Sequence, residues 1–275
     1  MGNIVVTGGS SGVGAALVQR LVHAGHQVFN LDVTEPAAPL AAQTFLRCDL
    51  GDAQAIAAAA AALPTRLHGL ANVAGMARAA DPVRVVAVNF LGLRDITRSL
   101  TPRLVEGCGI VNVSSIAGRD WRARLDRITP LLDTATMADG LAWCQVQAET
   151  FARDPYSFSK RCVTAFSLRE ARDHVHRGTR ILCVSPGGID TPLSPQFEAL
   201  MGSEQTAWSR GQIGRPAVPD EIAQVIEMLL CQPCGWLNGV DIPVDRGYCA
   251  GLESGWIDFG QSPVMQAMRA RKRPA

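Results

Sequence analysis

The sequence carries almost no excess charge of either sign. Its 26 Lys and Arg residues stand against 25 Asp and Glu residues, which leaves a formal net charge of +1. A nucleic-acid-binding domain, or a protein held on anionic lipid, is expected to show a basic excess. The composition therefore gives no reason to expect nucleic acid or a lipid surface as a partner.

Long apolar runs are missing as well. The longest bland stretch, 55–63, is rich in alanine and stops at Pro64, far short of the roughly 20 residues that a transmembrane helix needs. No charged leader precedes an apolar segment at the N-terminus, so we expect no secretory signal peptide. These absences favour a cytoplasmic protein that is not bound to a membrane.

The cysteines form no recognisable framework. All 8 are scattered through 275 residues, which favours free and mostly buried thiols over disulfides. Cys231 and Cys234 have the spacing of a metal or redox pair, but no second Cys or His pair is placed to complete a zinc site. We interpret this pair as a helix end and expect no bound metal.

What the chain does contain is a regular alternation of strand-like and helix-like segments. Its length suits one domain with a single large core. The alternation predicts an α/β fold, namely a Rossmann-type doubly wound parallel sheet of about seven strands with right-handed crossovers. The predicted strands cover 3–7, 27–32, 44–47, 67–73, 109–114, 180–185 and 240–244, and the predicted helices cover 13–24, 53–63, much of 83–105, 155–177 and 220–230.

Two departures interrupt this alternation. Pro36 and Pro39 leave no room for a full crossover helix between the second and third strands, because proline cannot continue a helix. Residues 119–153 are, in contrast, too long for a simple connection, and their apolar spacing predicts two short helices. We expect a single domain over 1–248 with this helical insert, followed by a C-terminal extension over 249–275.

A glycine-rich loop joins the first predicted strand to the first predicted helix. Glycines let the backbone turn tightly and approach a ligand, and a helix N-terminus favours a pyrophosphate. Such a loop alone can be a mere tight turn, so its strand-to-helix context carries the argument. The residues expected to bind a dinucleotide here are Gly8, Ser10, Ser11, Gly12, Val13 and Gly14.

The end of the second predicted strand indicates which dinucleotide is bound. Asp32 stands there, and a carboxylate in this place accepts hydrogen bonds from both adenosine ribose hydroxyls and repels a 2′-phosphate. The loop itself contains no Lys or Arg, so the sequence favours NAD over NADP. Further candidates for the adenosine end are Asp49, Leu50, Asn72, Ala74 and Gly75.

Tyr156 and Lys160 begin a predicted helix and share one of its faces, because residues four apart lie together. A free phenol has a pKa of ~10, but a nearby ammonium and the positive oxidised nicotinamide favour its ionised form. Ser115 ends the preceding strand at the edge where such sheets bind ligands, and it can donate to a substrate oxygen. Asn89 could link Lys160 to solvent through water. This combination predicts hydride transfer coupled to proton transfer, with Tyr156 as general acid/base.

Together these segments resemble those of short-chain dehydrogenases/reductases. The matching segments, in the order of that family, are TGGSSGVG at 7–14, NVAG at 72–75, NVSS at 112–115, YSFSK at 156–160 and PGGIDTP at 186–192. The resemblance implies that Asn89, Ser115, Tyr156 and Lys160 are the four catalytic residues. It further implies that Pro186, Gly187, Ile189 and Thr191 surround the nicotinamide, and that the protein is a homodimer or homotetramer.

Within the family, the missing crossover helix and the long insert resemble the branch that holds 3α-hydroxysteroid dehydrogenase/carbonyl reductase and bacterial coniferyl-alcohol dehydrogenase. This implies a bulky apolar alcohol or ketone as substrate, either a hydroxysteroid or an aryl/cinnamyl alcohol. Around Ser115 and Tyr156, the candidate apolar walls are Trp121, Trp143, Phe197, Met201 and Trp208. Arg246 departs from the family, which usually has a glycine there.

Two other functions use this type of fold. A regulator can bind NAD without turnover, but such a protein is expected to have lost the tyrosine or the lysine, and both are present here. A sugar-nucleotide epimerase or dehydratase generally has a larger C-terminal substrate domain, for which this chain has no room. The sequence therefore favours the dehydrogenase, with the non-catalytic NAD-sensing protein as the alternative.

Overall fold

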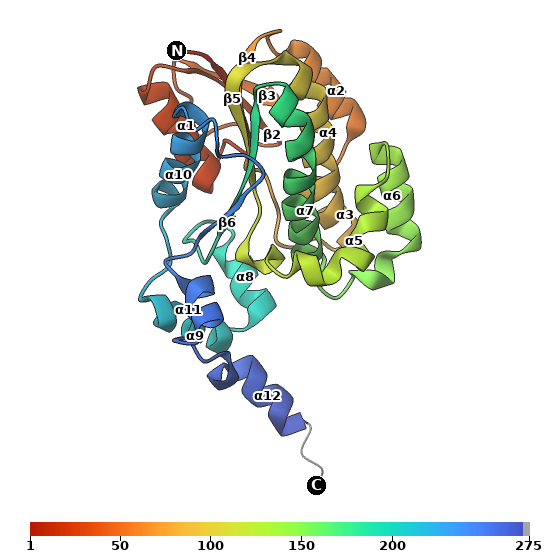
Figure 1. Ribbon diagram of the computed structural model, residues 1–275, viewed down its shortest axis with the longest axis vertical. Coiled ribbons are helices and arrows are strands. Elements are labelled where there is room, and N and C mark those ends of the chain that lie inside the picture. The colour runs from red at the N-terminus through yellow and green to blue at the C-terminus, as the bar shows by residue number, and fades with distance from the viewer. Residues whose placement is uncertain (272–275) are drawn as a thin grey trace.

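A seven-stranded, wholly parallel sheet forms the middle layer of the structure (Figure 1). The computed structural model describes residues 1–271. The strand order β3-β2-β1-β4-β5-β6-β7 reverses direction next to β1, and ligands bind at such a switch point, outside the carboxyl ends of the strands. The strands are β1 (Asn3–Thr7), β2 (Gln27–Asp32), β3 (Gln43–Arg47), β4 (Leu67–Asn72), β5 (Leu104–Val113), β6 (Arg180–Pro186) and β7 (Asp241–Val244).

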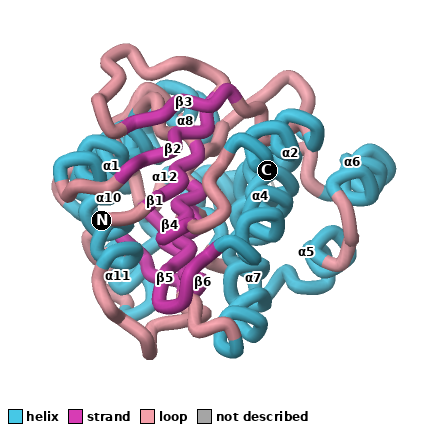
Figure 2. The backbone as a smooth tube through the Cα atoms, turned by 90° about the horizontal axis from the view of Figure 1, so that it is seen from above, coloured by secondary structure: helices cyan, strands magenta, loops and turns pink. Residues whose placement is uncertain are grey.

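Helices cover both faces of this sheet, which confirms the predicted doubly wound fold (Figure 2). One face carries α1 (Gly12–His23) and α10 (Pro219–Cys231), and the other carries α2 (Ala53–Ala62), α3 (Pro82–Val86), α4 (Leu93–Leu100) and α7 (Pro155–His176). Side chains of a strand alternate between the two faces. In β1, Ile4 and Val6 enter the core under α1 and α10, whereas Val5 enters the core under the other layer.

The predicted strands agree with the structure to within two residues except for β5. This strand begins at Leu104 rather than at 109, so the helix expected over much of 83–105 ends earlier than predicted. That helical stretch consists of α3, a π-helical segment (Ala87–Gly92), α4 and a 3-10 turn (Thr101–Arg103). Pro102 lies in this last turn, and it cannot continue α4 because it lacks a backbone N–H.

The insert consists of α5 (Leu125–Leu132) and α6 (Met137–Val146), as the sequence predicts, and both lie outside the α7 layer (Figures 1 and 2). A stack of three aromatic rings fastens it to the domain. Phe151 lies 4.9 Å from Phe158 and 6.4 Å from Trp143, measured between ring centroids. Because Phe158 follows Tyr156 by two residues in α7, the insert is packed directly behind the helix that carries the tyrosine.

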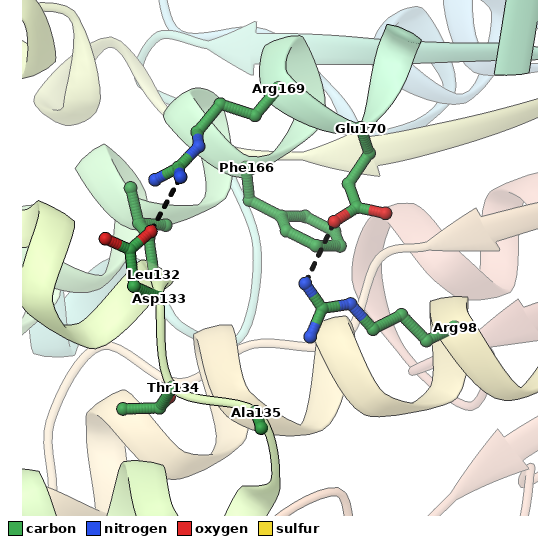
Figure 3. A pocket seen from close by; sticks show the side chains of 8 residues that line it. All are labelled: Arg98, Leu132, Asp133, Thr134, Ala135, Phe166, Arg169 and Glu170. Carbon is green, nitrogen blue, oxygen red and sulfur yellow. Dashed lines mark hydrogen bonds and ion pairs between the residues drawn. The ribbon is translucent and has the colours of Figure 1, made fainter. Parts of the chain in front are cut away.

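Polar contacts fasten the connection between α5 and α6 to the body of the domain. A cavity of about 300 Å³ lies between this connection, α4 and α7 (Figure 3). Two ion pairs line it, Arg98–Glu170 at 3.0 Å and Arg169–Asp133 at 2.6 Å. Such partly exposed pairs contribute at most about 1 kcal/mol each, so they position the insert more than they stabilise it.

Beyond the carboxyl ends of the strands lie the remaining helices α8 (Ser194–Met201), α9 (Ser203–Ile213), α11 (Tyr248–Ser254) and α12 (Pro263–Arg271) (Figure 1). The extension predicted over 249–275 starts inside α11, and its Cys249 and Ile257 are buried. Its first half therefore packs on the domain. The extension ends in basic residues between 269 and 273, of which Lys272 and Arg273 lie outside the described residues.

Arg246, where the family usually has glycine, adopts a left-handed backbone conformation with φ 54°. Residues with a Cβ rarely adopt this conformation. The backbone at this position is therefore the one that a glycine would accept without strain. No helix formed by residues 1–271 has both the length and the apolar character to cross a membrane.

Candidate active site

The carboxyl ends of the strands open into one continuous cleft of about 1390 Å³, which runs from the glycine loop after β1 to the segments that follow β7. Pockets for one small molecule usually measure about 300–1,000 Å³. The cleft therefore has room for a dinucleotide together with a second molecule.

The glycine loop after β1 is shaped for close backbone contact. Gly8 has φ +73°, and a Cβ on it would lie 2.6 Å from the Cα of Ala74. A Cβ on Gly14 would lie 2.0 Å from the carbonyl oxygen of Gly8, so no other residue fits either position. α1 begins at Gly12, and the side chain of Ser11 makes no capping hydrogen bond. The loop thus fits a pyrophosphate, which would bind the first-turn N–H groups.

Asp32 is fixed at the wall of the cleft by two backbone groups. Its carboxylate accepts hydrogen bonds from the N–H of Ser10 at 3.0 Å and from the N–H of Thr34 at 3.1 Å. The Ser10 hydroxyl donates to the carbonyl oxygen of Thr34 at 2.6 Å, and Ser10 is not among the residues that line the cleft. Ser10 therefore orients Asp32, which differs from the phosphate contact expected of it.

Asp49 also lines the cleft, but an arginine holds it. The Nη2 of Arg84 donates to both carboxylate oxygens at 2.7 Å, and the N–H of Gly51 donates at 2.8 Å. Burial opposes ionisation of Asp49, but these donors outweigh burial and lower the pKa of the carboxyl below its usual value. Arg84 lines the cleft too. No local pattern in the sequence marks it, because only the packing of α3 against the chain after β3 brings it there.

Asn72 was expected in the cofactor site, and the structure places its side chain in the interior instead. Its Nδ2 donates to Thr97 Oγ1 and to Asn112 Oδ1, both at 2.8 Å. The cleft is lined by Ala74 and Gly75, as predicted, and Leu50 lines it as well. Asn72 therefore joins β4 to β5 and α4 beneath the cleft.

Tyr156 and Lys160 lie at the start of α7, where the local sequence favours a helix. Asp154 caps the helix by accepting a hydrogen bond from the N–H of Ser157 at 3.0 Å, and Pro155 occupies the first position, which proline favours. The Lys160 ammonium lies 5.7 Å from the centroid of the Tyr156 ring. It also donates to the carbonyl oxygen of Val113 at 2.8 Å.

Burial shifts the ionisation of both groups. It raises the pKa of Tyr156 to about 12, although hydrogen bonding with Ser115 opposes this shift. It lowers the pKa of Lys160 to about 8. The protein alone therefore keeps the phenol protonated at neutral pH. The sequence predicts that the ammonium and the positive oxidised nicotinamide together favour the phenolate, and this role of Lys160 stays a prediction.

The two neighbouring serines after β5 have different surroundings. Ser114 is buried, and its hydroxyl donates to the carbonyl oxygen of Lys160 at 2.9 Å and meets the Thr164 hydroxyl at 2.8 Å. Ser115 is half-buried and lines the cleft, its hydroxyl accepts a hydrogen bond from the N–H of Ala117 at 3.2 Å, and it opposes the rise in the pKa of Tyr156. Ser115 is thus the serine that can meet a ligand beside the phenol.

Asn89 lies in the π-helical segment before α4 and does not line the cleft. Its Oδ1 accepts a hydrogen bond from the N–H of Met76 at 2.8 Å, and its Nδ2 donates to Met76 O and to Ser159 Oγ, both at 3.0 Å. The side chain amide uses both of its N–H groups and one lone pair of Oδ1, and it joins the loop after β4 to α7. The second lone pair of Oδ1 can still accept a hydrogen bond from water, so the water link to Lys160 stays a prediction.

The segment after β6 forms the opposite wall of the cleft. Pro186, Gly187, Ile189 and Thr191 all line it. A Cβ on Gly12 would lie 3.6 Å from the side chain of Thr191, so this wall reaches across to the glycine loop. The four residues expected around a nicotinamide are therefore placed together.

Of the five apolar walls expected for a substrate, the structure places two in the cleft. Phe197 and Met201 line it, and the Phe197 ring meets the Tyr156 ring edge-on with centroids 4.9 Å apart. The three tryptophans do not line it. Trp121 packs against the core under Arg122, Trp143 belongs to the aromatic stack of the insert, and Trp208 faces Phe259.

Several residues that line the cleft were not named as candidates from the sequence. Gln205 and Ser209 of α9, and Tyr248 and Phe259 after β7, all line the cleft. Tyr248 carries a usable signal, because it follows the carboxyl end of the last strand, where such sheets bind ligands. The residues of α9 carry none, since that helix has no sharp apolar face in the sequence.

Two family models match this chain, one in its first half and one in its second half. Residues 2–125 match the family described as short chain dehydrogenase, and residues 142–249 match the one described as enoyl-(acyl carrier protein) reductase. The chain is 36% identical over 245 residues to a coniferyl-alcohol dehydrogenase of Pseudomonas sp. strain HR199, covering 89% of this chain and 95% of that protein.

Two further relatives belong to a hydroxysteroid group. The chain is 28% identical over 251 residues to a 3-alpha-hydroxysteroid dehydrogenase/carbonyl reductase of Comamonas testosteroni, with 90% of this chain and 96% of that protein covered. The crystal structure of a 3-alpha-hydroxysteroid dehydrogenase from Pseudomonas sp. B-0831, complexed with NADH, superimposes with a TM-score of 0.74 at 28% identity. That match covers 93% of this chain and 100% of the other.

Proposed function

Because the chain belongs to the short-chain dehydrogenase/reductase family and is an alcohol dehydrogenase/carbonyl reductase of that type, we propose that it transfers hydride between NAD and a bulky apolar alcohol or ketone. In this proposal Tyr156 is the general acid/base. The observation that carries it is the meeting of Tyr156, Lys160 and Ser115 in a cleft whose other end has a glycine loop and a fixed carboxylate.

The described residues fit a nicotinamide dinucleotide. The N–H groups at the start of α1 would bind the pyrophosphate, and Asp32 would accept hydrogen bonds from the adenosine ribose hydroxyls. Asp49, held by Arg84, would lie at the adenine end. NAD rather than NADP is proposed because the anchored Asp32 carboxylate would lie against a 2′-phosphate.

Tyr156 performs the proton transfer in this mechanism. When bound, the nicotinamide supplies the hydride acceptor or donor, and in its oxidised form a positive charge. During oxidation the ionised form of Tyr156 takes the hydroxyl proton of the alcohol, and during reduction its protonated form gives that proton to the growing alkoxide. Ser115 donates to the same substrate oxygen and holds it in place. Lys160 adds a positive charge 5.7 Å from the phenol ring, which favours the phenolate.

The substrate class rests on the walls of the cleft. Phe197 and Met201 are apolar and close to the phenol, which suits a ring system rather than a small polar alcohol. The named relatives act, by their names, on coniferyl alcohol and on 3-alpha-hydroxysteroids. We therefore propose an aryl or cinnamyl alcohol, or a hydroxysteroid, as substrate. We do not propose the alternative, a non-catalytic NAD-sensing protein, because the chain is an enzyme.

Assembly and location belong to the proposal as well. We propose a homodimer or homotetramer, in which α5 and α6 cover one face of the α4 and α7 layer and so favour the dimer. Light scattering on the full chain and on a variant lacking 119–153 tests this, because an unchanged tetramer in both would contradict it. A cytoplasmic location agrees with eight free cysteines, six of them buried.

A turnover screen tests the proposed function. The purified protein is incubated with NAD, and separately with NADP, against cinnamyl, steroid and small alicyclic alcohols, while NADH absorbance is followed. Oxidation of a bulky alcohol with NAD supports the proposal. Equal rates with both cofactors would contradict the choice of NAD, and turnover restricted to small alicyclic alcohols would contradict the substrate class.

A further inference from the structure

The cleft extends past Phe197 into a region that the proposed chemistry does not use. α9, α11 and α12 lie farther from the sheet than α8 (Figure 1), and residues of all three helices line the cleft. The lining here is mixed: Ile213, Leu252 and Val264 of these helices are apolar, as are Ile257 and Phe259 between α11 and α12, whereas Arg210 and Asp258 are charged. A few uncharged polar side chains stand out against this surface.

Three of those polar side chains form a cluster, Gln205 and Ser209 from α9 and Tyr248 from the start of α11. The Ser209 hydroxyl lies 3.4 Å from the Tyr248 hydroxyl and 3.3 Å from Gln205 Nε2. The Oε1 of Gln205 accepts a hydrogen bond from the N–H of Val264, also at 3.3 Å. The cluster thus links α9 to both helices of the C-terminal extension.

The hydrogen bonds of this cluster are long. Hydroxyl pairs usually lie about 2.7–2.8 Å apart, and N–H···O pairs about 2.9–3.0 Å apart. Serine and tyrosine hydroxyls can each donate once, and the serine oxygen can accept twice. Ser209 and Tyr248 therefore keep hydrogen-bonding capacity that the protein does not use well, and they present it in this part of the cleft.

The unused capacity is open to the cleft. Gln205 is 9% exposed, and Ser209 and Tyr248 are half-buried. Both hydroxyls line the cleft and can be reached by a bound molecule. A ligand oxygen placed between Ser209 and Tyr248 would complete their hydrogen bonds, and it would displace no ion pair because none of the three side chains is charged.

We propose that Ser209 and Tyr248, supported by Gln205, form a second polar subsite that binds a neutral hydroxyl or carbonyl oxygen on the substrate, at the end opposite to the reacting alcohol. The inference rests on the proposed function, since it assumes that the reacting end lies at Tyr156. It narrows the substrate to an elongated molecule with an apolar middle and an oxygen at each end. The three side chains that would touch this oxygen carry no charge, which suits a neutral oxygen, while Arg210 lines the cleft next to Ser209.

Matched substrate pairs test this subsite. Cinnamyl alcohol is compared with 4-hydroxycinnamyl alcohol, and a 3α-hydroxysteroid without further oxygen is compared with one that has a 17-oxygen. The measured quantity is the ratio of kcat/KM for the oxygenated to the plain member of each pair. For the pair that the enzyme turns over, this ratio should be about 3- to 10-fold lower in Ser209→Ala and in Tyr248→Phe than in the unmutated protein. The fall should come mainly from a higher KM for the oxygenated substrate.

A control variant separates this effect from a general change in α9. Ser203 begins the same helix and is exposed, so Ser203→Ala should leave the ratio unchanged. The subsite would be overturned if this kcat/KM ratio were the same in the unmutated protein, in Ser209→Ala and in Tyr248→Phe. It would also be overturned if the ratio fell in Ser203→Ala as much as in Ser209→Ala.

Calorimetry makes the result independent of turnover. The Tyr156→Phe variant, saturated with NAD, is titrated with both members of each pair, with and without Ser209→Ala. Tighter binding of the oxygenated member to Tyr156→Phe, lost when Ser209→Ala is added, supports the subsite. If the unmutated protein oxidises no alcohol but this binding difference is present, only the proposed function fails. Equal binding of both members, or binding of neither pair, overturns the subsite.

Discussion

The ammonium of Lys160 lies 5.7 Å from the centre of the Tyr156 ring, and both residues are held by the first turn of α7. The spacing of four residues and the cap at Asp154 fix this relationship locally. Burial then acts on the two groups in opposite directions, raising the pKa of the phenol and lowering that of the amine. At neutral pH the phenol is therefore protonated, while the amine, with a pKa of about 8, still carries its positive charge.

The first prediction concerns the lysine and the stability of the fold. The pKa of Lys160 is about 8 in the folded protein against an ordinary 10.5, so between these pH values the unfolded chain binds a proton that the folded chain does not. The free energy of unfolding therefore rises with pH across this window. Relative to Lys160→Met, the unmutated protein should gain on the order of 1–2 kcal/mol between pH 7.5 and 9.5.

Urea denaturation at the two pH values measures this gain. The raised pKa values of the buried thiols act in the opposite direction, but they act in both proteins and cancel in the difference. The Tyr156 phenol titrates higher, near 12, and stays outside the range. Parallel pH dependence of the two proteins would show that Lys160 is not buried as described.

The second prediction concerns the cofactor. Asp32→Asn keeps the shape of the side chain but removes its charge, so binding of NAD should weaken about 10- to 100-fold and the preference over NADP should shrink. The matched control is Glu35→Gln, an exposed acid on the loop after β2, which should leave the preference unchanged. Dissociation constants of both nucleotides, measured for all three proteins, decide this. An undiminished preference in Asp32→Asn would refute the role of the carboxylate.

The third prediction concerns the aromatic stack of the insert. Phe151 is 3% exposed and stacks on Phe158, so Phe151→Ala should lower the free energy of unfolding by about 3–5 kcal/mol. Because Phe158 lies two residues from Tyr156 in α7, turnover should fall as well. The control Val146→Ala, at an exposed end of α6, should change stability by less than about 0.5 kcal/mol. Equal stabilities of the two variants would mean that the stack does not fasten the insert.

The sequence predicts those parts of the fold and site that depend on local pattern. The strand-to-helix glycine loop and the Tyr156–Lys160 spacing are set by neighbouring residues, and the structure has them where expected. The directions in which single side chains point were not predictable in the same way. Asn72 ends β4 and Ser10 stands in the glycine loop, as expected, but hydrogen bonds with distant segments turn both side chains away from the cleft.

The walls of the substrate end depend even more on packing between distant segments. The sequence predicts Trp143 as a wall of the substrate site, but its ring stacks on Phe151 and Phe158 and does not line the cleft. Arg84 and Tyr248 reach the cleft only because α3 and the C-terminal extension pack where they do. No period or motif encodes such contacts between segments, and these are therefore the parts that the structure adds.

The most direct test of the account is the turnover number of Tyr156→Phe with a bulky alcohol that the unmutated protein oxidises. This change removes one oxygen and leaves the ring against Phe197. The account predicts that kcat falls by about 10²- to 10⁴-fold, while the dissociation constant of NAD changes little. The exposed variant Ser99→Ala, remote from the cleft, should keep full activity. A Tyr156→Phe variant that turned over at the unmutated rate would contradict the account.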